Sequence, residues 1–248
     1  MLDIKNLTVR VGEKEILHNI NLSIHKGETA ILFGPNGSGK TSLLKTVIGM
    51  PDFRLESGSI IFKGSDITAL SIDERARLGI GMAFQRPPAI KGVILRDVLQ
   101  ICMKKVRTDF QDQVNRAAAR LTLLDFLDRD LNLGFSGGEI KRSELLQLIA
   151  QAPDFLMFDE PDSGVDLVSI SCVGRAINEL LQKDRRADMR SAAGLLITHA
   201  GYLLNYVNAD IAYVMFNGSI HCSGNPMDLL EDIRNKGYDG CLECRREN

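Results

Sequence analysis

Apolar and polar positions alternate along the first part of the chain, from Leu2 to Ile24. A period of two residues is typical of half-exposed strands, so we predict two or three antiparallel strands with a turn near Gly12 and Glu13. The run Thr29–Phe33 is apolar without interruption, which indicates a buried strand. Residues 41–48 then place apolar side chains at helical spacing. The pattern therefore predicts a β-rich start that leads into an α/β core.

The rest of the chain alternates short apolar runs with segments of helical spacing. The predicted strands, the last two joined by a type I′ turn at Asn217-Gly218, are residues 59–62, 82–85, 155–158, 195–199, 211–216 and 219–222. The predicted helices are residues 71–78, 137–152, 169–181 and 226–234. Residues 49–58 are predicted to be irregular, and the mixed charges of residues 183–190 predict a solvated loop.

Residues 94–127 differ from their surroundings because they combine helical spacing with many charges. One apolar stripe in this segment is predicted to be the core face of a helical lobe: Val114, Ala117, Ala118, Leu121 and Leu124. The chain thus reads as an α/β core with a helical insertion and a return to α/β order.

Composition limits the classes of protein to consider. The 248 residues are 44% apolar, enough for one substantial core, and the net charge of −2 does not favour nucleic acid or an anionic membrane as a partner. No apolar run is long enough to span a bilayer and no secretory signal is visible, so we expect a cytoplasmic protein without direct membrane insertion. The odd number of cysteines, five, also favours a reducing compartment. Cys241 and Cys244 form a single CxxC pair, too few thiols for a zinc cage, and their role stays open.

A glycine-rich loop follows the predicted strand Thr29–Phe33. Its residues match the phosphate-binding pattern of a Gly, four free positions and Gly-Lys-Thr. Glycines bring backbone N–H groups against phosphate oxygens, while the lysine supplies positive charge and the threonine hydroxyl is a ligand for Mg²⁺. A simple turn that caps a helix is the alternative. The strand–loop–helix context favours nucleoside triphosphate binding by Gly34, Pro35, Asn36, Gly37, Ser38, Gly39, Lys40, Thr41 and Ser42.

Other polar residues end predicted strands. Asp159 and Glu160 follow the apolar run Phe155–Phe158, so one carboxylate can serve the Mg²⁺ shell while the other orients a water for attack. Gln85 and His199 also lie at strand ends. Gln85 could contact Mg²⁺ or its water, but a Gln in such a place is usually solvated, and a His there is commonly a structural residue.

A second pair of glycines precedes the predicted helix 137–152. Ser136 can cap that helix, and Gly137 and Gly138 expose N–H groups at its positive end. This makes a second anion site far along the chain from the first, which suggests that two chains share two nucleotides. A glycine-rich helix start without a ligand is the alternative.

Together these motifs resemble the ATP-binding cassette (ABC) ATPases, and they follow the order of that family over nearly the whole chain. Residues 34–41 resemble its Walker A loop, residues 155–159 its Walker B strand and residues 163–166 its D-loop. The resemblance implies ATP and Mg²⁺ as ligands. It also implies a fold: one α/β domain over residues 1–248, with a P-loop core, an antiparallel β subdomain and a helical subdomain inserted at approximately residues 89–152.

The resemblance implies a role for each site residue. The residues in catalysis would be Lys40, Glu160 and the switch histidine His199. The Mg²⁺ ligands would be Thr41, Gln85 and, through the shell, Asp159. ATP binding would drive self-association, with the nucleotide of one copy covered by the signature motif and D-loop of the other: Phe135, Ser136, Gly137, Gly138, Glu139 and Asp166.

Within the ABC ATPases, several motif sequences are similar to those of the SufC group, the ATPases of iron–sulfur cluster assembly. Residues 82–93 resemble the Q-loop segment of that group, and Lys236–Tyr238 resembles its end. Phe135, Glu139 and Asp162 replace the Leu, Gln and Thr that are usual in transporters. This likeness implies a SufB/SufD-like scaffold as the partner that ATP hydrolysis reshapes.

Two features depart from these patterns. Pro161, which follows Glu160, is the residue that transporter ATPases usually have at this position. The aromatic residue that stacks on adenine in many cassettes is missing near Val11. We therefore expect looser base selectivity or a substitute apolar contact. The alternatives to cluster assembly are the ATP-binding subunit of a membrane transporter and a nucleotide-gated binding protein with negligible turnover.

Overall fold

The computed structural model describes residues 1–103, 110–198 and 202–243. Its centre is a six-stranded sheet in the order β12-β11-β3-β10-β9-β6, in which every pairing is parallel except that of β11 with β12. The strands are β3 (Thr29–Phe33), β6 (Ile80–Ala83), β9 (Phe155–Asp159), β10 (Ala193–Ile197), β11 (Ile211–Phe216) and β12 (Ser219–Gly224). Strands β3, β6, β9 and β10 are buried along their whole length, as their uninterrupted apolar runs predict.

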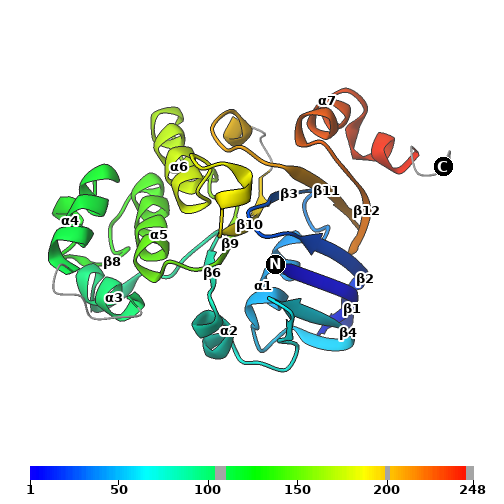
Figure 1. The fold of residues 1–248 in the computed structure, drawn as a ribbon, viewed down its shortest axis with the longest axis horizontal. Coiled ribbons are helices and arrows are strands. Elements are labelled where there is room, and N and C mark those ends of the chain that lie inside the picture. The colour runs from blue at the N-terminus through cyan, green and yellow to red at the C-terminus, as the bar shows by residue number, and fades with distance from the viewer. Residues whose placement is uncertain (104–109, 199–201, 244–248) are drawn as a thin grey trace.

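Two apolar cores lie on opposite faces of this sheet. Side chains alternate along each strand, so neighbours such as Leu195 and Leu196 belong to different cores. One core contains residues of α5 (Gly137–Gln151), α6 (Leu167–Leu180) and α7 (Pro226–Glu243). The other contains residues of α1 (Lys40–Ile48) and of the antiparallel sheet described next. Figure 1 shows this layered arrangement around the central strands.

A four-stranded antiparallel sheet, in the order β2-β1-β4-β5, contains the first residues of the chain. Its strands are β1 (Leu2–Val11), β2 (Lys14–Ile24), β4 (Arg54–Phe62) and β5 (Ser65–Asp66). The predicted alternation and the turn near Gly12 are confirmed. The prediction that residues 49–58 are irregular is wrong for residues 54–58, because pairing with β1 orders them although their side chains lack an apolar pattern. Gly58, with φ +88°, passes close to the backbone of β1, where a Cβ would lie 2.5 Å from the Lys5 carbonyl oxygen.

The helical part of the chain lies between β6 and β9, two strands that are neighbours in the central sheet. It occupies the left side of Figure 1 and contains β7 (Ile90–Ile94), α3 (Leu95–Cys102), α4 (Phe110–Arg120), η1 (Leu124–Phe126), β8 (Asp130–Leu131) and α5. The stripe prediction is wrong at Leu124, which is 48% exposed, because α4 ends at Arg120 and Thr122 has a positive φ of 56°. Leu123 is buried instead.

The remaining elements connect these layers. Ser71 caps α2 (Ile72–Leu78) in a capping box with Glu74, and the predicted helix over residues 71–78 is confirmed. Asn217 and Gly218 both have positive φ, as the predicted type I′ turn between β11 and β12 requires. Two short 3₁₀ segments complete the described chain: η2 (Ala187–Met189) and η3 (Tyr202–Asn205). None of the helices in the described ranges combines the length and apolar character that a bilayer span requires.

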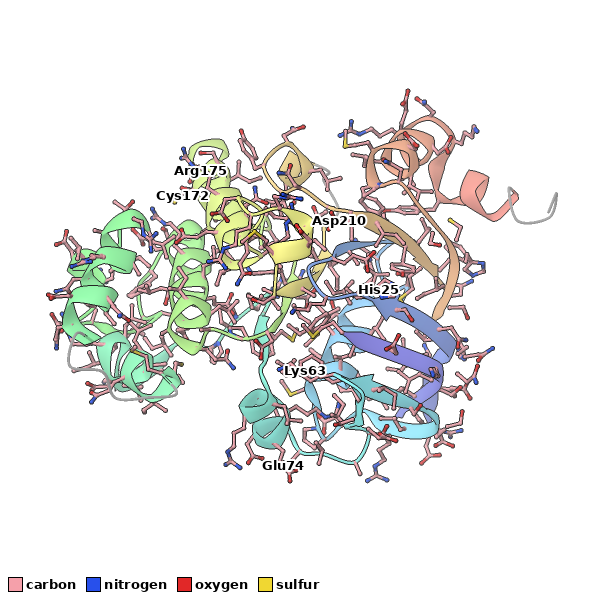
Figure 2. The ribbon with its side chains drawn as sticks, viewed as in Figure 1. His25, Lys63, Glu74, Cys172, Arg175 and Asp210 are labelled. Carbon is pink, nitrogen blue, oxygen red and sulfur yellow. The ribbon has the colours of Figure 1, made fainter. Side chains whose placement is uncertain are left out.

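The charged segment 183–190 is solvated over residues 184–189, as its composition predicts, but its first residue is buried. Lys183 is only 8% exposed and its ammonium group is 2.5 Å from the carboxylate of Asp210, a residue labelled in Figure 2. Asp210 also accepts a hydrogen bond of 2.7 Å from the Thr29 N–H at the start of β3. This ion pair therefore anchors the segment to the central sheet.

Arg75 on α2 is a buried residue whose loss we expect to destabilise the fold. It is 2% exposed and donates hydrogen bonds to the carbonyl oxygens of Leu70, Thr68, Thr46 and Val47, the last two in α1. Replacing Arg75 with Met leaves these acceptors buried without their donor, so the free energy of unfolding should fall by about 2–4 kcal/mol.

Urea denaturation followed by circular dichroism measures this change. The matched control is Arg77→Met on the same helix, because the Arg77 side chain is 77% exposed and its ion pair with Asp73 lies at the surface. The control should change stability by less than about 1 kcal/mol. Equal effects of the two substitutions would contradict the assignment.

Candidate functional site

The glycine-rich loop lies between β3 and α1, as predicted. Gly34 needs to be glycine because a Cβ there would overlap the carbonyl oxygen of Met215 on β11. Gly39 has φ +105° and is the N-cap of α1, so the free N–H groups of the first helical turn face the loop. The loop thus has the backbone form that anion binding requires.

Lys40 is buried at the base of this loop and is 5% exposed. Its Nζ donates hydrogen bonds to the carbonyl oxygens of Gly34 at 2.8 Å and Pro35 at 2.9 Å, which holds the loop around the ammonium group. Burial lowers the pKa of Lys40, while the carboxylates of Glu160 and Asp159 act against that shift. The Oγ of Ser38 in the same loop is buried and has no hydrogen-bond partner among the described residues. A phosphate oxygen is a suitable partner for both groups.

Asp159 lies at the end of β9, beside the start of α1. Its Oδ1 accepts a hydrogen bond of 3.0 Å from the Thr41 hydroxyl, and the residue is 2% exposed. Burial raises the pKa of Asp159, and the hydrogen bond from Thr41 opposes this shift. A hydroxyl and a carboxylate in contact are hard oxygen ligands of the kind that Mg²⁺ uses together with nucleotide phosphates. The donor set therefore fits Mg²⁺.

Gln85 and Glu160 meet although they are far apart in the sequence. The Gln85 side-chain amide donates a hydrogen bond of 2.5 Å to Oε2 of Glu160. Glu160 has a positive φ of 48°, a strained conformation for a residue other than glycine, and its backbone N–H donates to the Ile197 carbonyl oxygen at 3.1 Å. This turn at the end of β9 directs the carboxylate of Glu160 towards the loop.

Lys40, Thr41, Gln85 and Glu160 line one cavity of about 650 Å³. The loop residues Asn36 to Ser42 form one wall, and Gln85 and Glu160 lie on another. Sequence reasoning missed a third wall that comes from the antiparallel sheet and the β11–β12 turn: Lys14, Glu15, Ile16, His18, Asn217 and Gly218. The only sequence signal for this wall was the missing aromatic near Val11. Ile16 is the apolar residue that lines the cavity instead.

The second glycine pair lies outside this cavity. Ser136 caps α5 and accepts a hydrogen bond from the Glu139 N–H, and the Glu139 carboxylate accepts one from the Ser136 N–H. Gly137 packs against the loop before α6, where a Cβ would lie 2.5 Å from the Gly164 carbonyl oxygen. The residues 135–139 and Asp166 are thus not brought to the nucleotide cavity of their own chain.

His199 lies outside the described residues. The preceding Thr198 is buried, and its hydroxyl donates a hydrogen bond of 2.7 Å to Asp162. Cys244 also lies outside the described part, and nothing in the structure bears on the side chain of Cys241.

Two buried charged residues of α5 were missed by sequence reasoning. Glu144 Oε1 accepts a hydrogen bond of 2.7 Å from the Phe84 N–H, and Lys141 Nζ donates to the carbonyl oxygens of Phe84 and Gln85 at 2.7 and 2.8 Å. Burial raises the pKa of Glu144 to about 7 and lowers the pKa of Lys141. No sequence pattern marks these residues, because charges on a helix are usually solvated.

Comparison with known proteins identifies the class to which this site belongs. Residues 17–163 match the ABC transporter family. The chain is 37% identical over 254 residues to "Probable ATP-dependent transporter SufC" of Escherichia coli (strain K12), covering 98% of this chain and 99% of that protein. It is 40% identical over 250 residues to "Probable ATP-dependent transporter slr0075" of Synechocystis, covering 96% and 94% of the two proteins. A solved nucleotide-free ATP-binding cassette from an ABC transporter is 26% identical and superimposes with a TM-score of 0.78 over 95% of each chain.

The chain belongs to the ABC transporter family, as one of its ATP-binding cassettes. It is similar to SufC over its whole length. The predicted fold class, the likeness to the ABC ATPases and to SufC within them, and ATP hydrolysis as the activity are confirmed.

Glu144 should make stability depend on pH. Its folded-state pKa of about 7 lies above the ordinary value of 4.5, so the folded protein holds the proton more tightly than the unfolded chain does. The resulting stabilisation is present at low pH and is lost as the pH rises from about 4.5 to 7, by up to about 3 kcal/mol. Glu144→Gln cannot ionise and lacks this loss.

Urea denaturation of both proteins at several pH values between 5 and 8 measures the effect. The free energy of unfolding of the wild type should fall relative to that of the variant as the pH rises, since all other titrating groups are shared. A difference that does not change with pH would contradict the raised pKa.

Proposed function

We propose that this chain is the ATP-hydrolysing subunit that reshapes a SufB/SufD-like scaffold in iron–sulfur cluster assembly. The observation that carries the proposal is the meeting of Gln85 and Glu160 at the wall of the phosphate-loop cavity, in a chain similar to SufC over its whole length.

Phosphate binding is the role of the loop between β3 and α1. The backbone N–H groups of residues 34–42 and the ammonium group of Lys40 bind the phosphates of ATP. The buried hydroxyl of Ser38 supplies one more polar contact. Ile16 takes the place of the missing aromatic as an apolar contact for the base.

Hydrolysis needs a group that orients water beside the last phosphate. Glu160 has the position for this task, and the Gln85 amide holds its carboxylate in place. Thr41 and Gln85 would hold Mg²⁺ directly and Asp159 through its shell, and the metal would supply positive charge for the phosphate oxygens. His199 steadies the γ-phosphate.

A second copy of the chain completes the site. The signature residues Phe135 to Glu139 and Asp166 lie away from their own nucleotide cavity, so we infer that they close on the nucleotide of the partner copy when ATP binds. The capped N-terminus of α5 supplies free N–H groups for that contact. Residues 89–152 form the helical subdomain that carries the signature in a single cassette domain.

The scaffold is proposed from the likeness to SufC and from the motif spelling at Phe135, Glu139 and Asp162. The proposed location is the cytoplasm. The proposed assembly contains no nucleic acid and no segment of this chain inserted in a membrane.

The alternative is the ATP-binding subunit of a membrane transporter. Pro161 favours it, and the relatives are named as transporters. Both functions use the same site residues, so the bound partner distinguishes them.

Replacement of Glu160 with Gln should separate ATP binding from turnover. Because the carboxylate acts on the attacking water, steady-state phosphate release should fall by about 100-fold or more, while the dissociation constant for ATP changes less than about threefold. Glu179→Gln on α6 is the control, since that carboxylate forms an exposed ion pair with Arg120. Retained hydrolysis in Glu160→Gln would refute the assignment.

The partner is identified by capture from a lysate of the source cells with Glu160→Gln and Mg-ATP, followed by mass spectrometry. The proposal predicts that a protein similar to SufB or SufD is bound. A polytopic membrane protein in its place would establish the transporter alternative.

A further inference from the structure

The buried charges of α5 are placed where they can control Gln85. β6 pairs with β9 only from Ile80 to Ala83, so Phe84 and Gln85 have left the sheet. The backbone atoms at this point are nevertheless held, because Glu144 binds the Phe84 N–H while Lys141 binds the carbonyl oxygens of both residues. Three hydrogen bonds from one helix thus replace the strand pairing that ends at Ala83.

The burial of these two side chains indicates that the contacts have a purpose beyond packing. Glu144 and Lys141 are 6% and 4% exposed, although a charged side chain is costly to bury unless it has partners. Apart from its Phe84 contact, Glu144 has a second oxygen, Oε2, that is buried without a hydrogen bond and lies 3.8 Å from Lys141 Nζ. An apolar pair would fill the same space at lower cost. What the charged pair adds is the directional hold on the chain at residues 84 and 85.

This hold is transmitted to the site through one side chain. The Gln85 amide donates the 2.5 Å hydrogen bond to Glu160, so any shift of the Gln85 backbone moves the donor away from the carboxylate. A misplacement of about 1 Å in a positioned catalytic group is enough to reduce turnover strongly.

We propose that Glu144, supported by Lys141, is a positioning residue for Gln85. Their hydrogen bonds hold the backbone of Phe84 and Gln85 against α5, and they thereby orient the Gln85 amide towards Glu160. The inference rests on the roles proposed above for Gln85 and Glu160 in ATP hydrolysis.

A double-mutant cycle on ATP turnover tests the proposal. Turnover of the full-length chain with Mg-ATP is measured for the wild type, Glu144→Ala, Gln85→Ala and the double variant. If Glu144 acts through Gln85, Glu144→Ala should lower kcat about tenfold with less than a twofold change in KM for ATP, and it should add less than twofold to the loss in Gln85→Ala. If the two losses multiply, or if Gln85→Ala leaves kcat unchanged while Glu144→Ala lowers it, the proposal is wrong. Wild-type turnover, measured in the same assay, reports separately on the proposed function.

Two further variants separate positioning from loss of structure. Glu144→Gln keeps an oxygen that can accept from the Phe84 N–H, so its kcat should stay within about threefold of the wild type. Leu146→Ala removes a buried side chain from the same helix on the side that faces α3 and α4, and it should lower stability without a selective loss of kcat. Equal loss of kcat in Leu146→Ala and Glu144→Ala at matched folded fractions would overturn the proposal.

Discussion

The site depends on the parallel alignment of four strands. Because β3, β6, β9 and β10 run in the same direction, their carboxyl ends meet at one edge of the sheet, and the residues that follow them are brought together from distant parts of the chain. The hydrogen bond between Thr41 and Asp159 joins the first of these strand ends to the third. The same edge also brings charged groups together. The carboxylates of Asp159 and Glu160 both raise the pKa of the Lys40 ammonium group, against the effect of its burial.

The helix α5 connects two regions that the sheet alone would leave independent. Its N-terminus carries the capped signature glycines, and little more than one turn later Lys141 contacts the chain at Gln85. A helix transmits displacement along its axis with little internal deformation. A movement imposed on Ser136 by a second copy would therefore displace Lys141 and, through its hydrogen bond, the backbone of Gln85. In the proposed assembly, the contact of one copy with its partner's nucleotide would thereby be linked mechanically to the orientation of the Glu160 carboxylate in its own site.

The strongly periodic and motif-bearing parts of the fold were predictable from sequence. The buried strands, the phosphate loop and the capped helices have local signals that act over a few residues. The resemblance implied that Gln85 and Glu160 belong to one site, but their hydrogen bond was not predicted. Other features were missed because long-range contacts determine them. Residues 54–58 are ordered by pairing with β1, and Lys183 is buried through its ion pair with Asp210. The cavity wall at Ile16 belongs to the antiparallel sheet, and the alternation of its residues predicts the strands but not their position beside the phosphate loop. Periodicity also placed Leu124 in a stripe that ends where α4 ends, at Arg120.

Residue 137 has to be glycine for its packing against Gly164, independently of the nucleotide contact proposed for it. A side chain there would collide with its own chain, at the Gly164 carbonyl oxygen, before any second copy or nucleotide was present. The loop that such a side chain would displace contains Ser163 and leads to Asp166. The Asp166 side chain accepts a hydrogen bond from the Ser169 N–H at the start of α6. A substitution at this glycine would therefore disturb both segments that are proposed to face the second copy, residues 135–139 and residues 163–166. Its effect could not be assigned to the loss of a phosphate contact alone.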